Sequence, residues 1–311
     1  MTINKVMSNN VKSKIFDAFN NYFIQFSDFN YTITDKPQDN NIDIYHYHRP
    51  NIETKLKPNS IVTVHHDLED TDPWLHMDKF ISRYKEASHI VCLNTIQQQI
   101  LKQKGITNTT VIPHGYKDEI FEKKELRSYN KEKKITLGIV SKRYPRRVKG
   151  EAYLLELIKR LDSDKYDFIL VGEGRSKDAA LLGQYGFDVE VFNMLPYDLY
   201  PQVYKKIDFL LMISLFEGGP ANLPEALASA VPVITKDIAM AHDMIKDKQN
   251  GILLTGDIEE DALKIDMLHT NNGELFNKLQ QNLQEKQDIL SWKQVVQAYE
   301  EVYKKAAGIK I

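Results

Sequence analysis

Short apolar runs alternate with longer amphipathic segments along the whole chain. In the first half they predict strands at residues 4–7, 31–34, 43–46, 60–65, 89–93 and 110–113, and helices at 11–26, 72–86 and 96–104. In the second half they predict strands at 135–140, 167–171, 189–192, 209–213, 232–235 and 251–254, and helices at 152–161, 176–185, 197–205, 223–229 and 239–245. Helical periodicity then continues over residues 262–307.

This alternation predicts an α/β fold, because a helix after each strand returns the chain for a parallel neighbour. Residues 119–134 are rich in charge and poor in apolar side chains, which is typical of a linker. The chain therefore divides into two doubly wound halves, and 311 residues are comfortable for two domains. We expect a cleft lined by the carboxyl ends of both sets of strands.

Composition narrows the range of partners. The formal net charge is -2, so no global basic field indicates nucleic acid. Cys92 is the only cysteine and lies in an apolar run, so we expect an inert buried thiol and a reducing, cytoplasmic compartment. Residues 1–10 lack the apolar segment of a secretory signal, and the run at 209–216 is too short to span a bilayer. Any membrane contact is expected to be peripheral.

Two glutamates stand eight residues apart across a predicted strand-to-helix turn. Gly218, Gly219 and Pro220 break the strand just after Glu217, and Glu225 lies about one turn into the next helix. A helix that begins past the carboxyl end of a parallel strand presents free N–H groups to an anion. We expect both glutamates to face one crevice, on either side of a phosphate. This suits a ligand with hydroxyls at both ends, such as a nucleotide sugar.

A basic loop, residues 141–150, follows the first strand of the second half. Lys149 lies six positions after Arg143, and a guanidinium with an ammonium can clamp a diphosphate without a metal. A solvated loop without a partner is the alternative reading, and the loop taken alone favours it. The glutamate pair in the same half favours the clamp.

Histidines follow two predicted strands of the first half. His65, His66 and Asp67 end one strand, where a histidine can act as an acid, a base or a hydrogen-bond donor. Asp67 can orient the histidine or contact the ligand itself, and a histidine satisfied in a turn is the alternative. His46 and His48 end the preceding strand and are candidate neighbours. No metal motif accompanies this cluster, so we expect no metal site.

Three weaker features stay open. Gly172-Glu-Gly174 lacks the third glycine of a dinucleotide motif and predicts only a tight turn at the rim of the cleft. Residues 192–195 suit a pocket for a base, and the edge of a core strand suits them equally well. The amphipathic helix at 11–26, with Lys12 and Lys14, suits a membrane or a lipid-linked acceptor, although such helices more often cover a sheet.

Together these motifs resemble the GT-B-fold glycosyltransferases, close to the large retaining family four, over about residues 40–306. Residues 217–228 resemble the E-x7-E signature of that family, and Arg143 with Lys149 matches its donor-phosphate pair in spacing. Residues 62–68 resemble its strand ending in His-Asp-Leu, which places His66 at the histidine of the catalytic centre. The segments at 112–121 and 291–303 resemble its entry to the linker and its final helix.

The resemblance implies two Rossmann-like, doubly wound domains that face a cleft. Residues 1–130 would form an acceptor-side domain, residues 131–290 a nucleotide-sugar-binding domain, and residues 291–311 a helix that packs back on the first domain. It also implies sugar transfer, with retention, from a nucleotide-diphosphate sugar to a glycan or lipid-linked glycan. No other cofactor and no metal are implied, and a peripheral contact with the inner face of the membrane fits such an acceptor.

The resemblance also implies roles for single residues. Arg143 and Lys149 would hold the diphosphate, Glu225 the ribose hydroxyls and Glu217 the sugar hydroxyls, while His66, beside Asp67, would donate to a hydroxyl near the anomeric carbon. The remaining donor-binding residues would be Gly172, Met194, Leu195, Gly218, Gly219, Ala221, Asn222 and Leu223.

One departure concerns the loop after the first strand, which in the family usually carries two glycines. Here residues 7–10 are Met-Ser-Asn-Asn, so the acceptor side is not carried over, and Ser8, Asn9 or Asn10 are candidates for its hydrogen bonds. A nucleotide-sugar epimerase or hydrolase of the same fold is an alternative. A catalytically silent glycan-binding partner subunit is another, against which the intact set of two cations and two glutamates argues.

Overall fold

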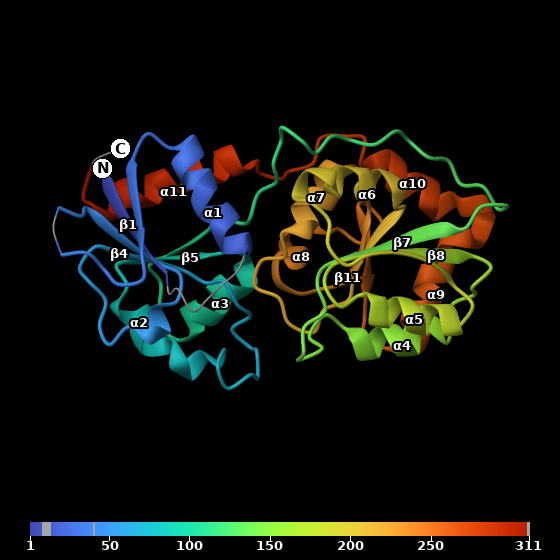
Figure 1. The fold of residues 1–311 in the computed structure, drawn as a ribbon, viewed down its shortest axis with the longest axis horizontal. Coiled ribbons are helices and arrows are strands. Elements are labelled where there is room, and N and C mark those ends of the chain that lie inside the picture. The colour runs from blue at the N-terminus through green and yellow to red at the C-terminus, as the bar shows by residue number, and fades with distance from the viewer. Residues whose placement is uncertain (8–13, 40, 310–311) are drawn as a thin grey trace. The chain divides into compact units, whose positions relative to one another are not determined.

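The computed structural model describes residues 1–7, 14–39 and 41–309, and the chain forms two compact units. Unit 1 consists of Met1–Gly115, Glu217–Pro220 and Leu290–Ile311, and unit 2 of Tyr116–Phe216 and Ala221–Ile289. Each unit has one parallel sheet of six strands covered by helices, so the predicted α/β fold is confirmed (Figure 1). The predicted loop residues Ser8, Asn9 and Asn10 lie outside the described residues.

The sheet of unit 1 has the strand order β2-β1-β3-β4-β5-β6. Its strands are β1 Thr2–Val6, β2 Asn30–Thr34, β3 Ile44–Tyr47, β4 Ser60–Thr63, β5 His89–Cys92 and β6 Thr109–Val111. Figure 1 shows α1 (Lys14–Phe26) and α11 (Trp292–Ala306) on one face, and α2 (Ile81–Glu86) and α3 (Thr95–Gln103) on the other. The thiol of Cys92 is buried within β5, which raises its pKa to about 12, as expected of an inert thiol.

Helix α1 places its apolar face on the sheet. Phe19, Tyr22 and Phe23, at the spacing of one helical face, are buried in a core that they share with α11. Of the two readings of this amphipathic segment, the structure therefore shows the covering of a sheet. Within the described part of the chain, no helix is both long and apolar enough to cross a bilayer.

The sheet of unit 2 has the strand order β12-β11-β10-β7-β8-β9. Its strands are β7 Ile135–Val140, β8 Tyr166–Val171, β9 Asp188–Phe192, β10 Phe209–Met212, β11 Val233–Lys236 and β12 Gly251–Leu254. Its helices are α4 Glu151–Ile158, α5 Ser176–Gln184, α6 Tyr200–Lys206, α7 Asn222–Ala228, α8 Ala239–Met244, α9 Ile258–Asp266 and α10 Glu274–Asn282. In Figure 1, α4 and α5 cover one face of this sheet, and α6 and α7 cover the other.

Two helix predictions were wrong. Residues 72–86 contain only a 3-10 turn, η2 (Met77–Lys79), and the short α2, because the carboxylates of Asp70 and Asp72 each accept a main-chain N–H two residues on. Residues 262–307 form three separate α-helices. Asn271 and Asn272 take left-handed backbone angles within η4 (Met267–Gly273), and nine residues without α-helix precede α11, which a capping box at Ser291 begins.

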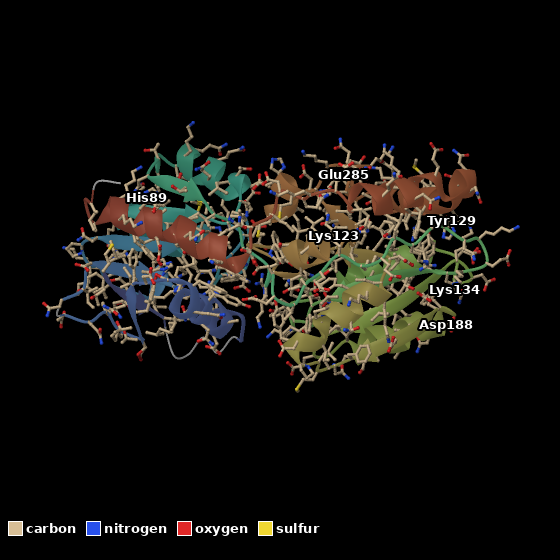
Figure 2. The ribbon with its side chains drawn as sticks, turned by 90° about the horizontal axis from the view of Figure 1, so that it is seen from above. His89, Lys123, Tyr129, Lys134, Asp188 and Glu285 are labelled. Carbon is tan, nitrogen blue, oxygen red and sulfur yellow. The ribbon has the colours of Figure 1, made fainter. Side chains whose placement is uncertain are left out.

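The charged segment 119–134 contains no helix or strand, but it is anchored to unit 2. Lys124 is buried and donates to the carbonyl of Ile207 at 2.5 Å, and Arg127 pairs with Asp208. Figure 2 shows two further anchors, Lys123 beside Glu285 and Lys134 beside Asp188. Its basic side chains thus bind it to several parts of unit 2, rather than leaving it as a free linker.

Candidate functional site

The chain order of unit 2 reverses between β7 and β10. Strands β8 and β9 follow β7 on one side, whereas β10, β11 and β12 lie on the other. In open parallel sheets, ligands bind outside the carboxyl ends of the two strands at such a switch point. The basic loop leaves β7 here and the glutamate segment leaves β10. The main-chain N–H of Leu215 donates to the carbonyl of Val148 at 2.8 Å, which joins the two segments.

Arg143, the first predicted phosphate ligand, is held by a buried ionic network. Its Nε donates to Oδ1 of Asp178 at 3.1 Å, and the other carboxylate oxygen accepts from Nη1 of Arg175 at 2.7 Å. Arg175 is only 1% exposed and also donates to the main chain and side chain of Ser141, at the end of β7. The guanidinium of Arg143 is thus tied to the strand end before any ligand binds.

Lys149 is held near β10 by the glycine that follows it. Gly150 has a φ of +82° and precedes α4, and a Cβ atom there would collide with the carbonyl of Ile213. Gly172 has a φ of +136°, and a Cβ atom on it would lie 2.5 Å from the carbonyl oxygen of Ser141. Both positions require glycine, because backbone passes backbone there. The predicted tight turn at Gly172 therefore packs directly under the basic loop.

Glu225 lies in α7 and is only 5% exposed. Its two carboxylate oxygens accept hydrogen bonds from the hydroxyls of Tyr197 at 2.7 Å and Tyr204 at 2.9 Å. Burial raises the pKa of Glu225 to about 7, although the two tyrosine hydrogen bonds oppose this shift. Neither tyrosine was predicted, because α6 and its preceding turn bring them to Glu225 from more than 20 residues away.

The other predicted donor-binding residues of unit 2 differ in what they can offer. The side-chain amide of Asn222 donates to the carbonyl of Val140 at 3.0 Å, so it joins α7 to the end of β7. The Leu223 side chain is fully buried, which leaves its main chain and that of Ala221 to meet a ligand. Met194 is 82% exposed and Leu195 is half-buried, so apolar atoms are available after β9.

Residues Glu217–Pro220 belong to unit 1, whereas Glu225 belongs to unit 2. The main-chain N–H of Glu217 donates to Oδ2 of Asp67 at 3.4 Å, and the carbonyl of Gly218 accepts from the side chain of Asn94 at 2.9 Å. A Cβ atom on Gly219 would lie 2.5 Å from Leu93, so this turn fits closely. Asp67 also accepts from the N–H of Glu69 and does not orient a histidine.

His66 is 5% exposed, and its Nε2 has no hydrogen-bond partner among the described residues. Its ring lies 4.1 Å from that of Phe80, and burial lowers its pKa to about 3, so it is neutral at physiological pH. Its carbonyl accepts from the side chain of Gln97 at 2.9 Å, and Asn94 caps the helix that carries Gln97. Asn94 and Gln97 were missed, although an asparagine before a helix is a recognisable cap.

The remaining histidines do not form a metal centre. His46 is fully buried and bonds to Tyr303 and Thr63 at 2.7 Å each, as a core residue does, and Nδ1 of His48 lies 2.9 Å from Nε2 of His65. Throughout residues 1–7, 14–39 and 41–309, no three histidine, cysteine, aspartate or glutamate side chains are grouped so that they could hold a metal ion.

Residues 134–271 match the model of the family described as "Glycosyl transferases group 1". This range contains the basic loop, both glycine turns and the glutamate segment. This part of the chain is therefore similar to the group 1 glycosyltransferases. No curated protein matches the chain.

Several solved structures share the fold over most of this chain. Sucrose-phosphate synthase from Thermosynechococcus elongatus matches at a TM-score of 0.76 with 12% identity, covering 98% of each chain. HepE of Anabaena, in complex with UDP and glucose, matches at 0.72 with 13% identity, covering 98% of this chain and all of its own. TarM of S. aureus matches at 0.60 with 21% identity, covering 78% of this chain and 50% of its own. Identities this low establish the fold alone.

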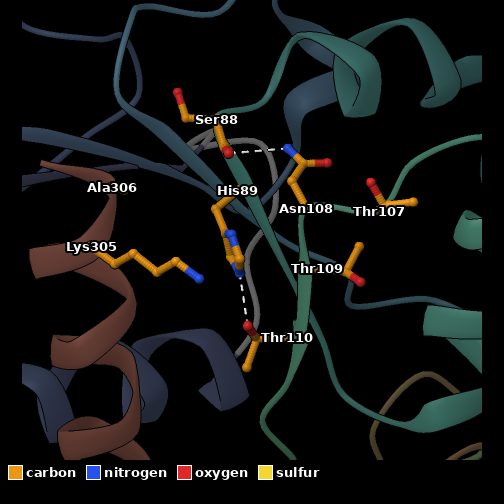
Figure 3. A pocket seen from close by; sticks show the side chains of 8 residues that line it. All are labelled: Ser88, His89, Thr107, Asn108, Thr109, Thr110, Lys305 and Ala306. Atoms are coloured by element: carbon orange, nitrogen blue, oxygen red, sulfur yellow. Dashed lines mark hydrogen bonds between the residues drawn. The ribbon is translucent and has the colours of Figure 1, made fainter. Parts of the chain in front are cut away.

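A hollow of about 410 Å³ in unit 1 has none of the predicted site residues in its lining (Figure 3). It opens at the amino ends of β5 and β6, beside the last turn of α11, and is lined by Ser88, His89, Thr107, Asn108, Thr109, Thr110, Lys305 and Ala306. Ligands of parallel α/β sheets bind at the opposite edge, so this hollow is not the candidate site.

Proposed function

We propose that this protein is a group 1 glycosyltransferase that moves a sugar from a nucleotide-diphosphate sugar to a glycan or lipid-linked glycan. The match of residues 134–271 carries the donor part, because it contains Arg143, Lys149 and Glu225. HepE binds UDP and glucose, so UDP-sugars are the first donors to test. The acceptor is proposed by analogy with enzymes of this fold.

The donor would bind at the switch point of unit 2. Arg143 and Lys149 hold the diphosphate and stabilise the charge that grows on the leaving phosphate. Glu225 accepts hydrogen bonds from the ribose hydroxyls. The main chain at Gly218, Gly219, Ala221, Asn222 and Leu223 provides N–H donors, and Gly172, Met194 and Leu195 border the base. In this proposal residues 131–290 form the donor domain.

The sugar and the acceptor would involve residues of unit 1. Glu217 bonds to hydroxyls of the sugar, and neutral His66, beside Asp67, donates to a hydroxyl near the anomeric carbon. Residues 1–130 form the acceptor side, which the helix at 291–311 completes. We propose transfer with retention, by attack on the face that the diphosphate leaves, with a leaving phosphate oxygen accepting the acceptor's proton. The two cations neutralise the diphosphate, so no metal is required. The enzyme works in the cytoplasm, at the inner membrane face if its acceptor is lipid-linked.

The first experiment measures binding of UDP, GDP and their sugars by calorimetry and thermal shift. Binding to the folded state raises the melting temperature. We expect one nucleotide-diphosphate sugar to bind best and Arg143→Ala to abolish this binding, whereas Lys177→Ala, which removes an exposed lysine on α5, leaves it unchanged. Absence of nucleotide binding would instead favour the silent partner subunit. Release of sugar without any acceptor would favour a hydrolase.

A further inference from the structure

Unit 1 has a switch point of its own. Strand β1 pairs with β2 on one side and with β3 on the other, so the chain order reverses between β1 and β3. Ligands are expected outside the carboxyl ends of these two strands. His48 and Arg49 are the first residues after β3, at that edge of the sheet.

Arg49 differs from the paired arginines of this chain. Its Nε and Nη1 are buried and have no hydrogen-bond partner in the described part of the protein. By contrast, Arg83 pairs with Glu86, and Arg160 with Glu156. The described contact of the Arg49 guanidinium is the ring of Phe16, whose centroid lies 5.6 Å away. Burying part of a guanidinium without a polar partner is costly, and burial lowers the pKa of Arg49 accordingly.

His48 adds a second unpartnered polar atom. It is 1% exposed, its Nδ1 lies 2.9 Å from Nε2 of the half-buried His65, and its own Nε2 has no partner among the described residues. When Nδ1 accepts the bond from His65, Nε2 of His48 carries a hydrogen and is a free donor. Burial chiefly, with the nearby His46, Lys5 and Arg49, keeps the pKa of His48 well below its usual value.

We propose that Arg49, with His48 and His65, binds an oxyanion of the acceptor, which is a phosphoryl or carboxylate group. The proposal rests on the proposed function in placing the acceptor on this unit. A guanidinium matches the two oxygens of either group, and an anion restores the charge balance that the folded protein lacks there. The hydroxyls of a neutral sugar would leave the charge uncompensated. The acceptor is therefore an acidic or phosphorylated glycan.

The test compares anionic probes with their neutral counterparts on the full chain. Glycerol 1-phosphate is paired with glycerol, and glucuronate with glucose, in calorimetry on the wild type, Arg49→Met and Lys55→Gln, which removes an exposed lysine of the same loop. All are repeated in a Lys149→Ala background, so that phosphate binding at the donor loop is excluded. We expect one anionic probe to bind, the neutral probes to fail, and Arg49→Met alone to weaken binding at least about tenfold. The anion that binds identifies the acceptor group.

The melting temperature without ligand separates a binding role from a structural one. Because Nε and Nη1 of Arg49 have no hydrogen-bond partner among the described residues, Arg49→Met should keep or raise the melting temperature, whereas removal of a structural arginine would lower it. Arg49→Lys keeps the positive charge but loses the planar guanidinium that can donate two parallel hydrogen bonds. This variant should fold, and it should bind the anion more weakly than the wild type does. Binding of neither anion, or equal binding by Arg49→Met, would overturn the proposal. UDP binding measured on the same variants tests the donor function separately, since Arg143, Lys149 and Glu225 lie in unit 2.

Discussion

An arginine lies at the carboxyl edge of each sheet, and the two arginines differ in whether a carboxylate pairs with them. In unit 2, Arg143 is held by Asp178, which in turn is held by the buried Arg175. In unit 1, Arg49 also lies at a switch point, yet its buried nitrogens have no partner among the described residues. The comparison shows that one topology supports both a preorganised cation and a cation whose charge only a ligand would balance. Preorganisation favours rate, whereas an unbalanced charge favours selection of an anionic ligand.

The largest expected effect is on transfer itself. Lys149→Ala and Glu217→Ala should each reduce the rate of sugar transfer by about 100-fold or more. Each removes one preorganised side chain that would contact the donor. Transfer is measured with the donor that the binding screen identifies. The melting temperature should stay near that of the wild type, and wild-type turnover in either variant would contradict the assignment.

The preorganised network of unit 2 can be broken at its centre. Asp178→Asn should weaken nucleotide binding about tenfold, because Arg143 loses its anchor. It should also reduce the free energy of unfolding by about 3 kcal/mol, because buried Arg175 keeps only the more distant carboxylate of Glu151, at 4.0 Å. Calorimetry and denaturant unfolding measure the two effects. Asp188→Asn is the matched control, since its pair with Lys134 is exposed and contributes little. Unchanged nucleotide binding in Asp178→Asn would show that Arg143 needs no anchor.

Glu225 should give the protein an unusual dependence of stability on pH. Its pKa rises from 4.5 in the unfolded chain to about 7 in the folded one, so between these values the folded state holds the proton and the unfolded state does not. Its contribution is therefore present below about pH 4.5 and is lost as the pH rises to about 7, by about 3 kcal/mol. Glu225→Gln should remove this part of the slope in denaturant unfolding. An unchanged slope would contradict the raised pKa.

The smallest expected effect is that of a chelator. Because Arg143 and Lys149 supply the charge that a metal would otherwise provide, transfer should continue in excess EDTA at the rate measured without it. Loss of transfer, restored by added Mg²⁺ or Mn²⁺, would show that the two cations are insufficient. The same assay on Arg143→Ala tests whether added metal can replace the guanidinium.

Much of the fold could be predicted from local pattern. Strands such as β7 and β12 were predicted to the residue, because each is a short apolar run bounded by polar turns. The breaks in the helical segments 72–86 and 262–307 were not predicted. Periodicity does not detect the left-handed backbone of Asn271, or a carboxylate that accepts the N–H two residues on. These choices are made by single side chains inside otherwise amphipathic segments.

The candidate site divides in the same way. Arg143, Lys149 and Glu225 stand in recognisable motifs next to strand ends, so the sequence was sufficient to select them. Their partners come from elsewhere in the chain, since Asp178 lies 35 residues after Arg143 and Tyr204 lies 21 residues before Glu225. That Nε and Nη1 of Arg49 have no partner among the described residues is equally a property of the folded chain, and no sequence pattern indicates it.

The position of α11 at the end of the chain determines which of the two units can finish folding first during synthesis. The core of unit 1 needs Trp292, which stacks on Tyr22 at 4.7 Å, and Tyr299, which packs on Phe23 at 5.1 Å. These residues leave the ribosome after the whole of unit 2, so the first sheet waits for its last helix with an apolar face exposed. A nascent chain that stalls near residue 290 would therefore carry a finished second unit and an aggregation-prone first one.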